Sequence, residues 1–228
     1  MKILLLSATL KESEGVLEAL SITKCLSKGF YRGFSGQKLI DILVSGPGTA
    51  ATTDCLTRRL NQSRYDLVMN IGICGSFKKD LHKGEIVNIV SETWGDLGAE
   101  DHDDFLDLFD LGLLKRDEGD FTGRELVNPG NLYSEYFSHF PRVKGLTVNK
   151  AHGKKESIEA CIKKYNPDIE SMEGIAVFIV CLSLGINFQC LRSISNFVEP
   201  RNRSDWDTET AFRNLTTEVK NIISAIRK

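Results

Sequence analysis

Short apolar runs recur along the chain, separated by polar and glycine-rich stretches. The runs predict buried strands at residues 2–8, 38–46, 66–72, 84–92, 145–149 and 187–195. Nearly every position of the first run, KILLLSA, is apolar, which is typical of a strand in a sheet covered on both faces. The intervening segments predict helices at residues 12–27, 49–61, 154–164 and 205–227, and another that begins within 168–185. Strands that alternate with helices predict an α/β fold with a largely parallel or mixed sheet.

Residues 93–131 interrupt this alternation. They are acidic and rich in loop-forming residues, and we expect one short helix within them, near 103–111. The acidic stretch HDDFLDLFD (102–110) lacks the ligand spacing of an EF-hand, which favours a solvated loop over a cation site. Since the chain has no internal repeat, low-complexity stretch or linker, we expect residues 1–228 to form one domain.

Composition and charge argue against several classes of function. A formal net charge of −2 offers no basic excess for nucleic acid or an acidic membrane surface. No apolar run reaches the roughly 18–20 residues that span a membrane. The apolar N-terminus could pass for a signal sequence, but Lys11, Glu12 and Glu14 follow at once, which favours a buried strand. Six scattered cysteines without a CxxC or zinc-like spacing indicate no metal site and a reduced, cytoplasmic setting.

Polar or glycine-rich clusters mark the places where chemistry is expected. In open α/β sheets, binding sites form at the carboxyl ends of strands, and clusters follow strands at residues 7–12, 45–48, 70–76, 149–152 and 195–196. A sixth cluster, 170–173, lies where a short strand meets a helix. SGPGTA (45–50) lacks the dinucleotide and phosphate-loop patterns and reads equally well as a tight turn. Glu170 and Glu173 fit the capping of a helix N-terminus, or acceptance of hydrogen bonds from two adjacent hydroxyls such as those of ribose.

Four stretches resemble, in order and spacing, the nucleoside phosphorylase and nucleosidase family: MKILLLSATLKES (1–13), VMNIGICGS (68–76), ESMEGIAV (170–177) and RSISN (192–196). The resemblance implies a single-domain three-layer sandwich with a central mixed, partly barrel-like sheet. Within the family, VSETWGDLGAED (90–101), GLTVNKAHG (145–153) and SNFVEPRNRSDW (195–206) are similar to the futalosine hydrolases. That branch implies conversion of futalosine and water to hypoxanthine and dehypoxanthine futalosine in menaquinone synthesis, without a cofactor, by a homodimer or higher homo-oligomer.

The resemblance also implies roles for individual residues. Glu12 would orient and deprotonate water, Glu173 would hold the ribose hydroxyls, and Met172 would pack against the sugar face. The leaving base would meet Asn196, which is therefore counted with Glu12 as catalytic. The implied base-side residues are Ile73, Cys74, Gly75, Asn149, Ala151, Ser195 and Asn196.

Two positions favour hydrolysis of a 6-oxopurine nucleoside. Phosphorolytic relatives hold phosphate with an arginine and a serine where this chain has Asn70 and Ile73, which favours water as the nucleophile. Adenine-cleaving relatives carry Asp where this chain has Asn196. An amide offers a donor to the O6 of hypoxanthine, whereas an ionised carboxylate does not. A structural asparagine that caps the following turn is the alternative.

The carboxyphenyl group beyond C5′ of futalosine needs a receptor for a ring and a carboxylate. The candidates for the 5′ side are Arg201, Arg203, His152 and Phe105, with Trp94 and Phe197 as further apolar walls. Solvated loop arginines and core aromatics are the alternatives. Other functions that remain open are a methylthioadenosine/S-adenosylhomocysteine nucleosidase, a 6-oxopurine nucleoside phosphorylase and a non-catalytic nucleoside-binding protein.

Overall fold

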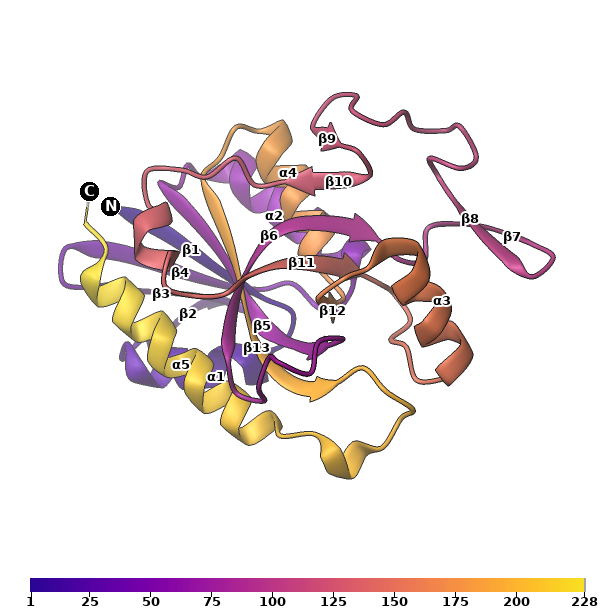
Figure 1. Ribbon diagram of the computed structural model, residues 1–228. Helices are drawn as coiled ribbons and strands as arrows, with labels where there is room; N and C mark the ends of the chain where they lie inside the picture. Colours follow the sequence, from indigo (N-terminus) through magenta and orange to yellow (C-terminus); the bar gives the residue numbers. More distant parts are fainter. Residues whose placement is uncertain (228) are drawn as a thin grey trace.

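One large mixed sheet with helices on both faces organises the chain (Figure 1). The computed structural model describes residues 1–227, with only the backbone of Arg203. The strands are β1 (Lys2–Ser7), β2 (Lys24–Ser27), β3 (Phe30–Ser35), β4 (Lys38–Val44), β5 (Leu67–Ser76), β6 (Ile86–Trp94), β7 (Gly98–Asp101), β8 (Asp104–Asp107), β9 (Phe121–Thr122), β10 (Glu125–Val127), β11 (Arg142–Thr147), β12 (Ile169–Ser171) and β13 (Phe188–Phe197). The helices are α1 (Leu10–Ala19), α2 (Thr49–Gln62), α3 (Lys155–Tyr165), α4 (Gly174–Ser183) and α5 (Thr208–Ala225), with 3₁₀ turns η1 (Ser134–Phe137) and η2 (Arg203–Asp205).

The centre of the sheet closes on itself. β13 pairs in parallel with β5 and antiparallel with β6, while β6, β11, β12 and β5 are hydrogen-bonded in that order. These five strands therefore form a closed ring, and β1, β4, β3 and β2 continue from β5 as an open wing. The expected mixed, partly barrel-like sheet is confirmed, and closure removes unpaired edges from the strands that carry the site.

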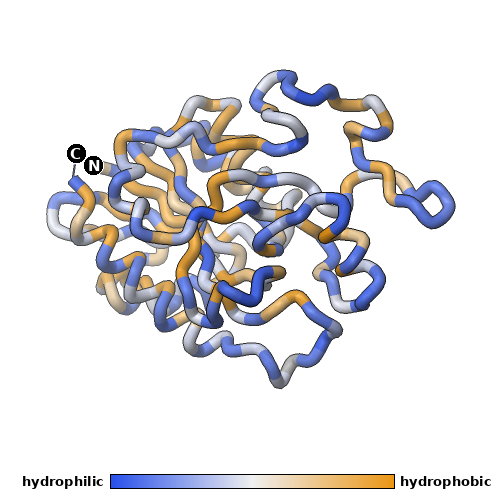
Figure 2. Tube along the Cα trace, in the orientation of Figure 1, coloured by the Kyte–Doolittle hydropathy of each residue, from blue (hydrophilic) through white to orange (hydrophobic). Residues whose placement is uncertain are grey.

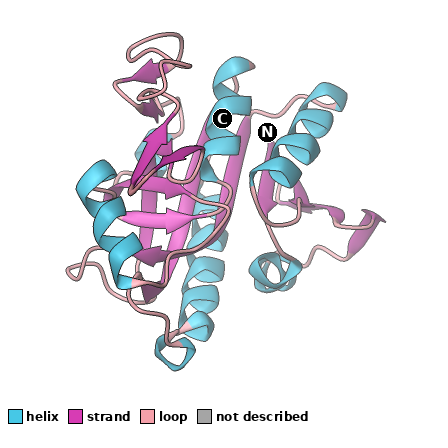
Figure 3. Ribbon diagram, turned by 90° about the vertical axis from the view of Figure 1, so that its right-hand side faces the viewer, coloured by secondary structure: helices cyan, strands magenta, loops and turns pink. Residues whose placement is uncertain are grey.

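β1 shows why the first apolar run is continuous. Ile3 and Leu5 face a cluster that includes residues of α1 and α5, whereas Leu4 and Leu6 face a cluster that includes residues of α2 and α4. All four side chains are fully buried, and burial of each stabilises the fold by roughly 1.5–3 kcal/mol. Helices lie on either side of the strands in the side view (Figure 3), and apolar positions gather along the central strands (Figure 2).

Two predicted helices are wrong in part. The helix expected at 12–27 ends at Ala19, because Ser21 adopts a left-handed backbone with φ of 53° and residues 24–27 pair with β3 as the strand β2. The short helix expected near 103–111 is absent from the described chain, since residues 104–107 pair with β7 in a hairpin that projects from the body (Figure 1). Pairing with a neighbouring strand overrides the local pattern in both places. Within residues 1–227, no helix is both long and apolar enough to cross a bilayer.

Candidate active site

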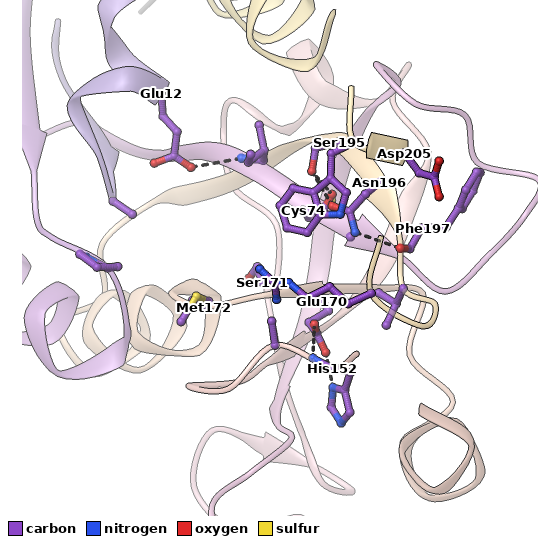
Figure 4. A pocket seen from close by; sticks show the side chains of 18 of the residues that line it. Glu12, Cys74, His152, Glu170, Ser171, Met172, Ser195, Asn196, Phe197 and Asp205 are labelled. Atoms are coloured by element: carbon purple, nitrogen blue, oxygen red, sulfur yellow. Dashed lines mark hydrogen bonds and ion pairs between the residues drawn. The ribbon is translucent and has the colours of Figure 1, made fainter. Parts of the chain in front are cut away.

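A cavity of about 390 Å³ lies where β1, β5 and β13 reach their carboxyl ends and α4 begins. Twelve of the sixteen residues that the sequence nominated line it: Glu12, Ile73, Cys74, Gly75, Ala151, His152, Met172, Glu173, Ser195, Asn196, Phe197 and Arg201. Figure 4 shows Glu12 and Asn196 on opposite sides of this space, with Met172 below Glu12. The sheet topology therefore brings together segments that lie up to 189 positions apart in the sequence.

Glu12 is held by three donors. Its Oε2 accepts hydrogen bonds from the Thr9 amide at 2.8 Å and the Thr9 hydroxyl at 3.0 Å, and its Oε1 accepts from the Ile73 amide at 3.3 Å. The Thr9 pair is half of a capping box at the start of α1. The glutamate is thus fixed by the same contacts that begin the helix.

Gly72 makes room for that carboxylate. A Cβ on Gly72 would lie 2.6 Å from Glu12 Oε1 and 3.5 Å from the Nε of Arg192. Real Cβ atoms do not approach an oxygen that closely, so any other residue here displaces Glu12. The first glycine of the NIGICGS stretch therefore acts by its missing side chain, inside β5 and not in a loop after it.

Glu173 occupies the N-cap position of α4 and is 8% exposed. Its Oε1 accepts a hydrogen bond from the Gly48 amide at 3.0 Å. Gly46 and Gly48 both have φ of 89°, a backbone conformation that favours glycine, and this turns the Gly48 amide toward the carboxylate. Burial raises the pKa of Glu173, while the charge of Arg192 and the Gly48 amide act in the opposite direction. SGPGTA thus forms a tight turn that also anchors an acid of the site.

Arg192 lies beside Glu173, and the sequence predicted no role for it. It is 1% exposed, and its Nη2 donates to Asn70 Oδ1 at 2.5 Å and lies 4.0 Å from Glu173 Oε2. Its Nε, which lies on the Gly72 side, has no hydrogen-bond partner within the described structure. A charged residue inside the apolar run FQCLRSIS was the available signal. Asn70 is thereby explained as the residue that holds this guanidinium.

Asn196 ends the regular part of β13 next to a bulge. Ile194 pairs with Cys74 and Asn196 pairs with Gly75, which leaves Ser195 as the extra residue. The Ser195 hydroxyl lies 2.7 Å from Asn196 Oδ1, and Asn196 Nδ2 donates to the Phe197 carbonyl at 2.9 Å. The amide orientation is set by these two contacts. One N–H and one oxygen lone pair of Asn196 remain for a ligand.

Four nominated residues have other surroundings, and one of them, Trp94, packs against Phe121 with ring centroids 6.1 Å apart. Asn149 does not line the cavity, because its amide groups bind Asp96 and its Oδ1 accepts from Thr49. Phe105 lies in β8, where Lys164 donates to its carbonyl and sits 5.3 Å from its ring, so it is not a wall of this cavity. The side chain of Arg203 is outside the described residues.

Two buried acids make contacts that the sequence did not predict. Glu170 lines the cavity and accepts hydrogen bonds from the His152 amide at 3.0 Å and from the His152 ring, so it fixes the 151–152 segment at the cavity wall (Figure 4). Glu92 is fully buried behind α4, and burial raises its pKa to about 8. Its Oε2 accepts from the hydroxyl of Thr147 at 2.8 Å, and Thr147 accepts from the Ile175 amide.

The charges favour a ligand that becomes cationic at the Glu12 end. Glu12 and Glu173 are both about 9% exposed or less, and Arg192 is the buried cation beside them. Two carboxylates against one guanidinium leave a net negative charge when both are ionised. Within the described residues, no group of three or more His, Cys, Asp or Glu side chains has a geometry suited to a metal ion.

Comparison with solved structures confirms the fold. No family model matches the chain. A 5′-methylthioadenosine/S-adenosylhomocysteine nucleosidase of Helicobacter pylori superposes with a TM-score of 0.83 at 18% identity, covering 99% of both chains. The native futalosine hydrolase of the same organism superposes with a TM-score of 0.81 at 19% identity, covering 99% of this chain and 98% of the other.

Curated relatives are more similar in sequence. The futalosine hydrolase of Streptomyces coelicolor is 31% identical over 196 residues, which is 78% of this chain and 76% of the relative. That of Acidothermus cellulolyticus is 30% identical over 182 residues, which is 77% of this chain and 71% of the relative. With this identity over most of both sequences, the chain belongs to the futalosine hydrolase family of N-glycosyl hydrolases.

Proposed function

We propose that this protein hydrolyses the N-glycosidic bond of futalosine, releasing hypoxanthine and dehypoxanthine futalosine in menaquinone synthesis. The observation that carries the proposal is the meeting of Glu12, Glu173 and Asn196 on one cavity. Such a reaction needs a base for water, an anionic partner for the sugar and a partner for the departing purine. The family membership supplies the substrate.

Glu12 is the general base for the attacking water. Three hydrogen bonds hold its carboxylate, so it meets the water in one orientation. A correctly placed base contributes typically 10²–10⁴-fold to the rate. The Nε of Arg192 and the Oε1 of Glu12 lie 3.5 and 2.6 Å from the same point, the Cβ position that is empty at Gly72, so this unpartnered Nε is a donor that can orient the same water.

Glu173 binds the two ribose hydroxyls and stabilises the sugar cation. Its Oε1 is fixed by Gly48, and its Oε2 remains open toward the cavity. N-glycoside cleavage develops positive charge on the sugar, and a poorly solvated carboxylate interacts with that charge more strongly than one in water. Met172, the preceding residue, contributes an apolar surface against the sugar.

Asn196 is complementary to hypoxanthine as it leaves. A 6-oxopurine that has taken a proton at N7 presents an N7–H donor beside the O6 acceptor. The free lone pair of Asn196 Oδ1 can accept from N7–H, and the free N–H of Nδ2 can donate to O6. Adenine presents two donors in the same places, so it would leave the amide N–H facing another donor.

Water is favoured as the nucleophile because the two positions that hold phosphate in phosphorolytic relatives carry no cation here. The phosphate-binding positions of phosphorolytic relatives hold Asn70, which is bound to Arg192, and Ile73. Arg192 itself is engaged by Asn70, by the Leu191 carbonyl and by Glu173. A second anion here would compete with Glu173 for one guanidinium.

The test is chromatography of the released base. Futalosine, inosine and methylthioadenosine are incubated with the protein, each with and without phosphate. We expect hypoxanthine from futalosine at the same rate in both buffers and no adenine from methylthioadenosine. Strict phosphate dependence would make the protein a phosphorylase, adenine release would make it an adenosine-type nucleosidase, and no release would indicate a binding protein.

The working form is also part of the proposal. We infer one domain over residues 1–228 that acts in the cytoplasm, without a cofactor, as a homodimer or larger homo-oligomer. Exposed apolar side chains support self-association, since Phe34 and Leu113 are each 68% exposed and Leu132 is 83% exposed. Light scattering on the purified protein measures its mass directly, and a monomer at micromolar concentration would contradict the oligomer.

A further inference from the structure

Two aromatic side chains at the outer part of the cavity each have a cation over the ring. Lys11 Nζ lies 5.7 Å from the ring centroid of Phe212, and the guanidinium carbon of Arg201 lies 5.6 Å from that of Trp206. All four residues line the cavity. No ion pair joins either cation to an acid within the described structure, so both positive charges are available to a ligand.

Backbone contacts fix the positions from which the side chains of Lys11 and Arg201 extend. Lys11 precedes Glu12 in the first turn of α1, so its backbone lies on the side of the cavity where Glu12 is proposed to bind the attacking water. The Arg201 amide donates to the Gly153 carbonyl at 3.2 Å, which ties the 198–206 segment to the wall that also carries His152. The Asp207 amide donates to the Ser195 carbonyl at 2.8 Å and fixes the adjoining Trp206 beside the base end.

The acids of this region leave an excess of positive charge. Glu199 lines the cavity but is paired with Lys79 at 2.9 Å. Asp205 also lines the cavity. Figure 4 shows it beside Phe197, across the cavity from Glu12, so it is also far from the backbone of Lys11, the neighbour of Glu12. Two unpaired cations thus face one acid, and the inner half of the cavity is negative by contrast. A substrate that is anionic and aromatic at one end and becomes cationic in the middle matches this polarity.

We propose that Lys11 and Arg201, with the rings of Phe212 and Trp206, form a subsite for an aromatic carboxylate attached beyond the 5′ carbon of the nucleoside. This inference rests on the proposed function, because the carboxyphenyl group of futalosine is the group it would hold. The rings stack against the phenyl ring, and the two cations donate hydrogen bonds to its carboxylate. The subsite selects against nucleosides with a small neutral 5′ group.

Binding of the base-free product tests the subsite without any need for catalysis. Calorimetry measures the Kd of dehypoxanthine futalosine for the wild type, Lys11→Met, Arg201→Met and Lys79→Met. We expect each of the first two substitutions to weaken binding about fivefold, the size of one exposed ion pair. Lys79 is the matched control, because it also lies over a cavity aromatic, 4.0 Å from the Phe197 ring, but is paired with Glu199.

Hydrolysis of inosine separates this inference from the proposed function. Inosine has no carboxylate, so Lys11→Met and Arg201→Met should leave its kcat/KM unchanged while that for futalosine falls about fivefold. Unchanged product affinity in both variants, or equal losses on inosine and futalosine, would overturn the subsite. Absence of base release by the wild type would instead overturn the proposed function, and the product affinities would still decide the subsite.

Discussion

Replacement of Asn196 by Asp gives the sharpest test of base recognition. The substitution removes the N–H that faces O6 and the one that donates to the Phe197 carbonyl at 2.9 Å. Since residue 196 is 9% exposed, water does not replace the lost donors freely. An unpaired buried acceptor costs roughly 1–3 kcal/mol, which corresponds to a loss of about 5- to 150-fold in kcat/KM at 1.4 kcal/mol per tenfold.

The assay is the initial rate of hypoxanthine release from futalosine and inosine and of adenine release from methylthioadenosine. We expect Asn196→Asp to lose activity on both 6-oxopurines together and to gain on adenine, because a carboxylate accepts from N7–H and the 6-amino group. Asn214→Asp is the control, since Asn214 also donates to a carbonyl, that of Gly84 at 2.8 Å, outside the cavity. Unchanged 6-oxopurine rates in Asn196→Asp would refute the base-reading role.

Three further substitutions test other contacts. Gly72→Ala should cut the kcat of futalosine hydrolysis by at least tenfold with little change in the far-UV spectrum, because the new Cβ meets the Glu12 carboxylate at 2.6 Å; an active variant would contradict that fit. For Glu92→Gln, the gain in Tm over the wild type should grow from pH 4.5 to about 8 and stay constant above that pH. Burial raises the pKa of Glu92 from 4.5 to about 8, so between these values the unfolded wild type is ionised at this residue while the folded wild type is not. A Tm difference that does not change with pH would exclude this titration. Asp41→Asn should lower the free energy of unfolding measured in urea by about 3–5 kcal/mol, because it removes the fully buried carboxylate that pairs with Arg32 and Arg59. A loss below about 1 kcal/mol would show that these two ion pairs are dispensable.

The sequence brought forward the residues proposed as catalytic because polar side chains next to apolar runs are conspicuous. Glu12 and Asn196 follow apolar runs and Glu173 directly precedes one, and the fold brings all three to one cavity. Glu92 and Arg192 were given no role for the opposite reason. They lie inside apolar runs, where only the folded neighbours reveal that a carboxyl group meets Thr147 or that a guanidinium meets Asn70.

Errors in the prediction come from contacts between distant segments. Asn149 belongs to a promising cluster, yet Asp96, 53 positions earlier, accepts its amide groups. Phe105 was nominated as an apolar wall, but β7–β8 pairing carries it into a projecting hairpin. Helix periodicity likewise gave no hint that residues 24–27 would pair with β3. Local pattern predicts which segments are buried, while the partners of polar groups depend on the whole topology.

The bulge at Ser195 has a consequence for how this site can diverge. Because one extra residue sets the position of Asn196 against Gly75, the side chain at 196 can be exchanged while the backbone stays in place. Loss of a single residue between 193 and 195 would instead carry every later side chain of the strand to the opposite face. Base preference is therefore open to point substitution, whereas the length of this segment is not free to vary. A library of single-residue deletions across 190–197 should contain no active members, even where substitutions at the same positions survive.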